Sequence, residues 1–257
     1  VPVKTSNELY VEGLRFVSKA PSVKYRGIFI NDEDWGLQPW AAKNVDVDIK
    51  DIGPKTYARV CELLLRLKGN MFAPAMHTCT GAFYQYPESK VVADEYGIII
   101  TTSHCEPLLF NNASKWEWNS KRDGEWNYTT NKDGILKKLD ERVKEASPFE
   151  NIYTVGMRGL HDEGLRGKHT AQEKVEILTN VIADQRNILE KHLNKPANEI
   201  QQIFVPYKET MEIYELGLEV PEDVTLVWVD DNYGYIKRLS NIKEQKRSGG
   251  AGVYYHL

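Results

Sequence analysis

Short apolar runs that end in charged or amide side chains recur along this 257-residue chain. In the clearest one, residues 225–229 lead directly into Asp230, Asp231 and Asn232. A parallel barrel gathers the C-terminal ends of its strands on one face, so residues remote in sequence meet there. The pattern therefore predicts buried strands whose ends build an active site. The other runs are 27–30 before 31–34, 70–76 before His77, 97–102 before 103–106, 152–155 before 157–163, and 202–206 before 207–209.

Helical periodicity marks the segments between these runs. Residues 57–68 and 170–192 carry apolar side chains at three- and four-residue spacing, which is typical of amphipathic helices, and Thr170 is a candidate cap. Residues 131–145 and 210–216 are further candidates. Strands alternating with helices predict an α/β fold with a parallel sheet. The periodic positions are Val60, Leu63, Leu64 and Leu67 in the first helix and Val175, Leu178, Ile182, Ile188 and Leu189 in the second.

The number of strands falls short of a complete barrel. An eight-unit (β/α)8 TIM barrel takes about 250 residues, yet the run 252–256 is only the seventh strand, and the sequence stops at Leu257. The first residue, Val1, is not a start methionine. We therefore expect residues 1–22 to lead in from a preceding domain, and residues 23–257 to form a TIM barrel truncated before its last strand or strands.

Composition is that of an ordinary globular protein, with 41% hydrophobic residues, 27% charged residues and a net charge of −4. No basic arm or low-complexity tract points to nucleic acid, and no apolar run approaches the roughly 20 residues of a membrane span. Three widely spaced cysteines indicate neither a disulfide framework nor a zinc ribbon. Cys61 falls on the apolar side of its helix, which predicts a core position.

Aromatic residues gather in the segments that follow the strands. Flat apolar faces beside acids and amides suit sugar rings, although each ring could instead pack a loop onto the barrel. The polar stretch 111–132 reads as a long loop above the barrel mouth, where binding loops belong. The aromatic residues are Trp35, Trp40, Phe83, Tyr84, Tyr86, Trp116, Trp118, Trp126, Tyr128, Tyr207, Tyr233 and Tyr235.

Seven strings, in consistent order from about Val23 to Leu257, resemble the catalytic barrel of glycoside hydrolase family 115. That family contains xylan α-1,2-glucuronidases. The strings are 25–34 (YRGIFINDED), 93–97 (ADEYG), 102–107 (TSHCEP), 155–159 (VGMRG), 207–209 (YKE), 228–232 (WVDDN) and 247–256 (RSGGAGVYYH).

The resemblance implies inverting removal of glucuronic acid, or its 4-O-methyl ether, from xylan without a metal or cofactor. Glucuronoxylan or a related uronic-acid-bearing plant glycan is therefore the expected partner. The resemblance also implies further domains of the same parent chain, with a homodimer through them as an open expectation. A secreted, periplasmic or cell-surface location follows from the polysaccharide substrate alone.

Two motifs depart from the family pattern at the expected site. The chain has His104 and Cys105 where the family commonly shows two histidines. Residues 159–164 read Gly-Leu-His-Asp-Glu-Gly where the family often shows Gly-Asp-Gly-Asp-Glu-Pro. Arg158 and Asp162 keep the family spacing, so the core chemistry is expected to survive. The substrate preference is less determined, and a uronic acid on another plant glycan stays open.

Inverting hydrolysis needs a carboxylic acid that protonates the leaving oxygen and a carboxylate that activates water, about 6.5 to 9.5 Å apart. Glu209, which follows the fifth strand, is our candidate for the general acid. Asp162 is the candidate base through its position and its family spacing. Asp230 and Asp231 are competitors, and one of this pair is expected to cap or pair with local structure instead.

The substrate carboxylate also needs a partner. The planar fork of Arg158 suits it, and Lys208 can add a point charge. The alternative is that Arg158 pairs with Asp162 or Glu163 and only orders the loop. At the first strand end, Asp32 and Asp34 are expected to face the site and Glu33 to turn away. The remaining sugar-binding candidates are Tyr207, Asn232, Asp231, His104 and His256.

Two other functions stay open. A barrel with His77, His104, Glu106, Asp162 and Asp230 at its strand ends could hold a metal that activates water, as metal-dependent hydrolases do. No His-x-His or comparably tight ligand pair supports that reading. A non-catalytic carbohydrate-binding barrel is the second alternative, in which the acids only accept hydrogen bonds from sugar.

Overall fold

Parallel strands form the centre of the computed structural model, which describes residues 10 and 12–256. Each predicted run contains a strand, although the hydrogen-bonded part is short. The strands are β1 (Gly27–Phe29), β2 (Met71–Ala73), β3 (Ile99–Ile100), β4 (Tyr153–Thr154), β5 (Gln202–Phe204), β6 (Thr225–Val229) and β7 (Ala251–Tyr254).

The strands lie side by side in sequence order. β1, β2 and β3 form one parallel sheet, and β4 to β7 form another. A parallel bridge between Ile100 and Asn151 joins them. At the two ends of the array, the rings of Phe29 and Tyr254 approach to 5.8 Å between centroids. The α/β fold with parallel strands is confirmed, whereas the truncated (β/α)8 barrel is not shown and stays a prediction.

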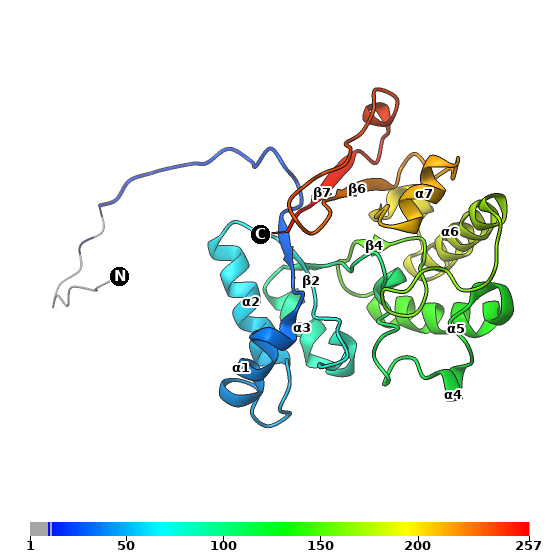
Figure 1. The fold of residues 1–257 in the computed structure, drawn as a ribbon. Helices are drawn as coiled ribbons and strands as arrows, with labels where there is room; N and C mark the ends of the chain where they lie inside the picture. The colour runs from blue at the N-terminus through cyan, green and yellow to red at the C-terminus, as the bar shows by residue number, and fades with distance from the viewer. Residues whose placement is uncertain (1–9, 11, 257) are drawn as a thin grey trace.

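Helices connect the strands and pack around them (Figure 1). The four predicted helices are present as α2 (Pro54–Arg66), α5 (Tyr128–Ala146), α6 (Ala171–Leu193) and α7 (Glu209–Glu215). Three short helices were not predicted, because four to eight residues hardly establish a period. These are α1 (Leu37–Asn44), α3 (Glu88–Glu95) and α4 (Ser120–Asp123), beside the 3-10 turns Glu33–Trp35, Phe83–Gln85, Pro107–Leu109, Ala197–Glu199 and Glu244–Lys246.

The long helices begin at defined caps. Thr170 and Glu173 form a reciprocal capping box at the start of α6, as the sequence predicts for Thr170. At α2, the Asp46 carboxylate accepts the backbone N–H of Thr56 at 2.8 Å. The buried side of α2 contains Tyr57, Val60, Cys61 and Leu64. The expected positions Leu63 and Leu67 are instead 50% and 68% exposed.

Residues 111–132 are not an open binding loop. Trp118 and Trp126 are buried, and the Trp126 ring stacks on Phe110 at 5.6 Å. Phe83 and Tyr84 are buried as well. These four rings therefore pack loops into the fold, which was the alternative left open for each ring, because burial of an aromatic face away from water is stabilising. Three of the expected aromatics are strongly exposed in the loops after β1 and β6: Trp35, Tyr233 and Tyr235.

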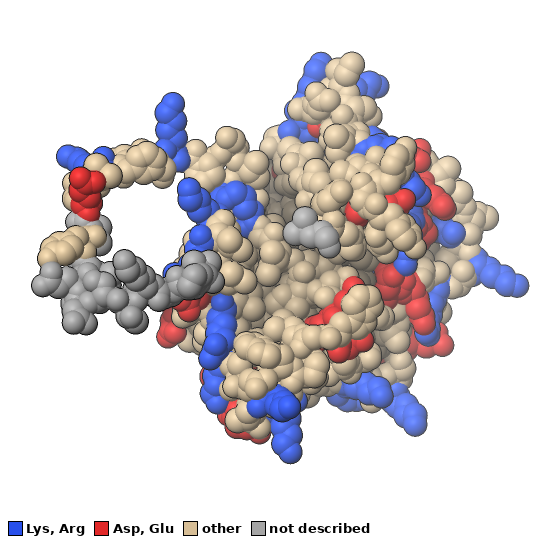
Figure 2. Space-filling model, turned by 60° about the vertical axis from the view of Figure 1, so that its left-hand side comes forward, with Lys and Arg blue, Asp and Glu red and all other residues tan. Residues whose placement is uncertain are grey.

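The surface carries charges of both signs. Figure 2 shows acidic and basic side chains interspersed over one face. Residues 12–22 are exposed and have no regular secondary structure. The sequence predicts that residues 1–22 lead in from a preceding domain, and such a domain lies outside the described part of the chain. Within that part, no helix combines the length and apolar character that a membrane crossing needs.

Candidate active site

A buried side chain of α6 holds the backbone that follows β4. Buried Gln185 accepts the N–H of Gly156 at 2.7 Å and donates to its carbonyl at 2.8 Å. Gly156 has φ 92, a left-handed conformation that favours glycine. The indole N–H of Trp126 also donates to the carbonyl of Arg158 at 3.1 Å. Tertiary contacts therefore hold the backbone that carries Arg158.

Arg158 joins carboxylates from two strand ends. Its Nε and Nη2 donate to the two oxygens of Glu209 at 3.0 and 2.7 Å, and its Nη1 donates to Asp162. Glu209 lies at the start of α7, after β5. The guanidinium fork is thus committed to protein acids, and Arg158 is only 2% exposed. These contacts support the alternative in which Arg158 orders the loop through Asp162, and they add Glu209 to it.

Asp162 is surrounded by hydrogen-bond donors. Lys208 Nζ lies 2.5 Å from one carboxylate oxygen, and His104 Nε2 lies 3.0 Å from the other. Burial alone would raise the pKa of Asp162, but the hydrogen bonds from His104 and Lys208 and the charge of Arg158 outweigh it and hold the pKa well below its usual range. Asp162 is therefore a carboxylate throughout the physiological range.

Three more predicted residues belong to this group. His104 and Tyr207 have ring centroids 4.4 Å apart. Burial lowers the pKa of His104 against the pull of Asp162, which favours the neutral imidazole. Lys208 has φ 50, a strained conformation for a lysine. The structure thus brings together six predicted site residues from the ends of β3, β4 and β5: His104, Arg158, Asp162, Tyr207, Lys208 and Glu209.

A second pair joins the last two strands. Asp230 is buried, and its carboxylate lies 2.5 Å from His256 Nδ1. Tyr254, two residues before His256, packs its ring 5.2 Å from that imidazole. Burial raises the pKa of Tyr254, and the nearby charge of Asp230 adds to the effect. The prediction missed Tyr254, although strand alternation places it on the same face as His256.

The other two residues after β6 have different roles. Asp231 accepts the backbone N–H groups of Tyr233 at 3.1 Å and Tyr235 at 3.2 Å. It therefore shapes a turn, which is the local role expected for one of the adjacent acids. Asn232 has φ 70 and is exposed. Sugar binding by either residue stays a prediction.

The expected orientation of Glu33 is wrong. Glu33 points inward with its side chain fully buried, and its Oε1 accepts a hydrogen bond from the backbone N–H of His77 at 2.7 Å. Asp32 and Asp34 are the exposed residues. The alternation rule fails here because Asp32 adopts φ 51 and starts a 3-10 turn, so the chain is no longer extended.

Glu106 lies deep behind the strand ends. Its Oε2 accepts a hydrogen bond from Ser103 Oγ at 3.2 Å. Burial, supported by the negative charges of Glu117 and Glu33, raises the pKa of Glu106 to about 8. The five residues of the metal-hydrolase alternative do not share one centre. Donor atoms within 4.8 Å of one another occur in two other sets of described residues: His104, Cys105 and Asp162, and Asp32, Asp34 and His77.

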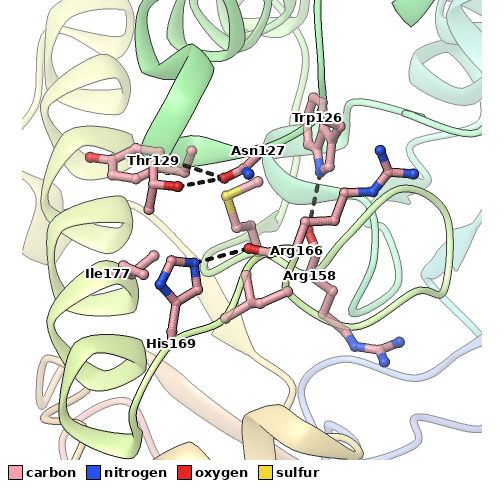
Figure 3. Close-up of a pocket in the computed structure, with 10 residues that line it drawn as sticks. Trp126, Asn127, Thr129, Arg158, Arg166, His169 and Ile177 are labelled. Atoms are coloured by element: carbon pink, nitrogen blue, oxygen red, sulfur yellow. Dashed lines mark hydrogen bonds between the residues drawn. The ribbon is translucent and has the colours of Figure 1, made fainter.

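A small pocket borders the backbone of Arg158 (Figure 3). Besides the bond from Trp126, a ring nitrogen of His169 lies 3.0 Å from the carbonyl of Arg166. The lining includes neither Asp162 nor Glu209. The pocket is therefore separate from the site of the two acids, although Arg158 belongs to both.

Carboxylates collected at the ends of parallel strands, with tyrosine and histidine rings beside them, define a site suited to hydrolysis of a sugar bond. A family model, glycosyl hydrolase family 115, matches residues 18–257. The chain belongs to this family, as its seven strings predict.

A solved structure agrees closely with the fold. It is described as a novel family GH115 4-O-methyl-α-glucuronidase, BtGH115A, with specificity for decorated arabinogalactans. The TM-score is 0.88 at 48% sequence identity, over 92% of this chain and 31% of that one. The present chain thus spans about a third of that relative. No curated protein matched.

A second solved structure is the apo form of the E. coli 3-keto-D-glucoside 4-epimerase YcjR. It has 10% identity and a TM-score of 0.36, over 80% of this chain and 89% of that one. A similarity this low carries no argument about the site.

Proposed function

We propose that this chain provides the catalytic residues of an α-glucuronidase that releases glucuronic acid or its 4-O-methyl ether from a plant glycan. Family membership supplies the class of reaction. The observation that supports it best in this chain is the Arg158 fork, because it holds Asp162 and Glu209, carboxylates from two strand ends, at one place.

Asp162 is the proposed base. Its depressed pKa keeps it ionised, so it can orient and deprotonate water but cannot serve as the proton donor at neutral pH. Lys208 contacts one oxygen of the Asp162 carboxylate, and His104 contacts the other. An inverting reaction needs such a carboxylate opposite the leaving group.

Glu209 is the proposed acid, and the substrate would prepare it. In the present structure Glu209 is the bidentate partner of Arg158. A uronate carboxylate arriving near Arg158 and Lys208 competes for the same cations. As the pair with Arg158 loosens, the Glu209 carboxyl is freed to turn toward the glycosidic oxygen, to which it delivers a proton as the acid. A neutral sugar would not provide that exchange.

The glycan is proposed from two sources. The family resemblance points to glucuronoxylan, whereas the relative at 48% identity is described as specific for decorated arabinogalactans. Residues 159–164, which include Asp162, depart from the common family motif. We therefore place decorated arabinogalactan first and glucuronoxylan second. Secretion or cell-surface display would bring the protein to either polymer, and fractionation of the producing cells tests that location.

The test uses the full natural chain that carries this sequence. It is incubated with 4-O-methylglucuronic-acid-bearing arabinogalactan and, separately, with 4-O-methylglucuronoxylan, and the released sugar is followed by proton NMR within minutes. Early appearance of the β-anomer supports inverting α-glucuronidase activity. Early α-anomer contradicts inversion, and no release from either glycan contradicts the function. A carboxyl-reduced glycan, in which glucuronic acid becomes glucose, should not be cleaved if the substrate carboxylate prepares Glu209.

A further inference from the structure

A group of metal-ligating side chains lies at the ends of β1 and β2, apart from the Arg158 cluster. Asp32, Asp34 and His77 place donor atoms within 4.8 Å of one another. The Oδ1 of Asp34 is 3.8 Å from the Nδ1 of His77. Within the described part of the chain, no lysine or arginine forms an ion pair with these acids. Their negative charge is therefore not balanced by a permanent cation.

Glu33 adds an independent observation. One of its oxygens, Oε1, accepts a hydrogen bond from the backbone N–H of His77. The other oxygen, Oε2, is buried and has no hydrogen-bond partner among the described residues. This oxygen lies 3.7 Å from His77 Nδ1, the same nitrogen that faces Asp34. A buried carboxylate oxygen without a partner is costly, and such a group calls for an explanation.

The distances from His77 Nδ1 to the Glu33 and Asp34 oxygens leave space for an ion beside this nitrogen. At 3.7 and 3.8 Å, the Glu33 and Asp34 oxygens are too far from His77 Nδ1 for a hydrogen bond. Two ligands bound to one tetrahedral metal ion at roughly 2.0 to 2.2 Å lie about 3.3 to 3.6 Å apart. A small contraction would therefore let one ion contact His77 and Asp34, and Asp32 also offers a donor atom within 4.8 Å of both.

We propose that Asp32, Asp34 and His77 bind a divalent transition-metal ion of the Zn²⁺ class, with the buried Glu33 carboxylate beside His77 adding negative charge. An imidazole nitrogen with carboxylate oxygens suits such ions, whereas Ca²⁺ and Mg²⁺ prefer oxygen alone. The ion would tie the turn after β1 to the segment after β2. The proposal concerns binding only and does not depend on the proposed glycan reaction.

The other donor set is a poor competitor. Asp162 already has Arg158, Lys208 and His104 as partners. Burial also raises the pKa of the Cys105 thiol, which disfavours the thiolate that a metal needs. Two nearby cations would repel a third. The carboxylates around His77 have no such neighbours in the described residues, so their negative field favours an added ion.

Calorimetric titration of the metal-stripped full natural chain with ZnCl₂ tests the site. We expect one saturable site, with binding roughly tenfold or more weaker in Glu33→Gln, Asp34→Asn and His77→Ala. Glu33→Gln keeps an oxygen for the His77 N–H, and Asp34 is exposed, so these two variants are conservative. His192→Ala, which removes a histidine paired with Asp140 elsewhere, should bind as the unaltered protein does.

Several outcomes overturn the proposal. Absence of saturable binding excludes the site. Binding that Asp34→Asn and His77→Ala leave unchanged places the ion elsewhere. Equal affinity for Mg²⁺ or Ca²⁺ excludes the transition-metal class. Anomalous scattering at the zinc edge, in crystals of the metal-loaded protein, should place the ion next to His77 Nδ1.

Discussion

Acids on the two sides of the strand array are in opposite electrostatic states. After β4 and β5, Asp162 and Glu209 are held by Arg158, with Lys208 as a further partner of Asp162. After β1 and β3, Glu33 and Glu106 are buried, and no lysine or arginine pairs with either among the described residues. Acidic residues that follow different parallel strands thus differ in whether a lysine or arginine pairs with them.

The difference in ion pairing distinguishes the roles of these acids, which their positions after the strands alone do not. An acid whose pKa is depressed by cations is available as a base or a charged anchor. A buried acid without a cation either keeps its proton, as Glu106 does at neutral pH, or needs an added cation. The chemistry is therefore expected on the β4 and β5 side, and the β1 and β2 side is expected to bind an ion or to support the site.

The largest expected effect is on turnover. Asp162→Asn and Glu209→Gln should each lower the initial rate of uronic acid release by roughly a thousandfold, because each removes a proton-transfer group. Because the pKa of Asp162 lies well below its usual range, its titration should cause no rate loss above about pH 4.

Asp140→Asn is the matched control, since Asp140 pairs with Lys191 and His192 away from the site. It should retain the full rate. Substantial activity in both site variants would move catalysis away from the β4 and β5 side, with Asp230 as the next acid to test.

The next effect is on stability. Arg158→Ala should lower the free energy of unfolding by about 3 kcal/mol, because it leaves the Glu209 carboxylate without its buried partner. Arg166→Ala removes an exposed pair with Glu163 in the same loop and should cost well under about 1 kcal/mol. Urea denaturation measures both. Equal losses would mean that the Arg158 fork contributes no more than a surface ion pair.

The smallest step in free energy, taken per unit of pH, concerns Glu106. Burial raises the folded-state pKa of Glu106 from its ordinary value of 4.5 to about 8, so the folded state binds the extra proton between these values. Stability should therefore fall as pH rises through this window, by at most about 1.4 kcal/mol per unit from this group. Glu106→Gln stays neutral and should flatten that slope. Parallel pH profiles for the two proteins would show that Glu106 is not held protonated.

Much of the fold followed from periodicity, and its failures are local. The strand runs and the long helices were predicted, because alternating elements of that length carry their own pattern. The buried side of α2 was misplaced because Leu63 and Tyr57 both fit a helical stripe, and only the packed neighbours decide which one leaves water. Trp126 was left open between sugar contact and packing, because a sequence does not show that Phe110 covers its ring.

The site was predicted as a set of residues more accurately than as a set of contacts. Arg158 and Asp162 are four residues apart, so their pairing was one of two interpretations. Glu209 is remote in sequence, and its bidentate contact with Arg158 depends on how two loops fold. Glu33 was misassigned because the left-handed Asp32 rotates the chain after it. Such a turn changes the face of every residue that follows.

The contact between Phe29 and Tyr254 has a consequence for how the protein folds. These rings belong to the first and last strands, so almost the whole described chain lies between them. Bringing such distant segments together costs loop-closure entropy before any packing compensates it. During synthesis, β1 emerges long before β7, so the Phe29–Tyr254 contact waits until β7 is available. Formation of this contact is therefore expected to be a late event in folding.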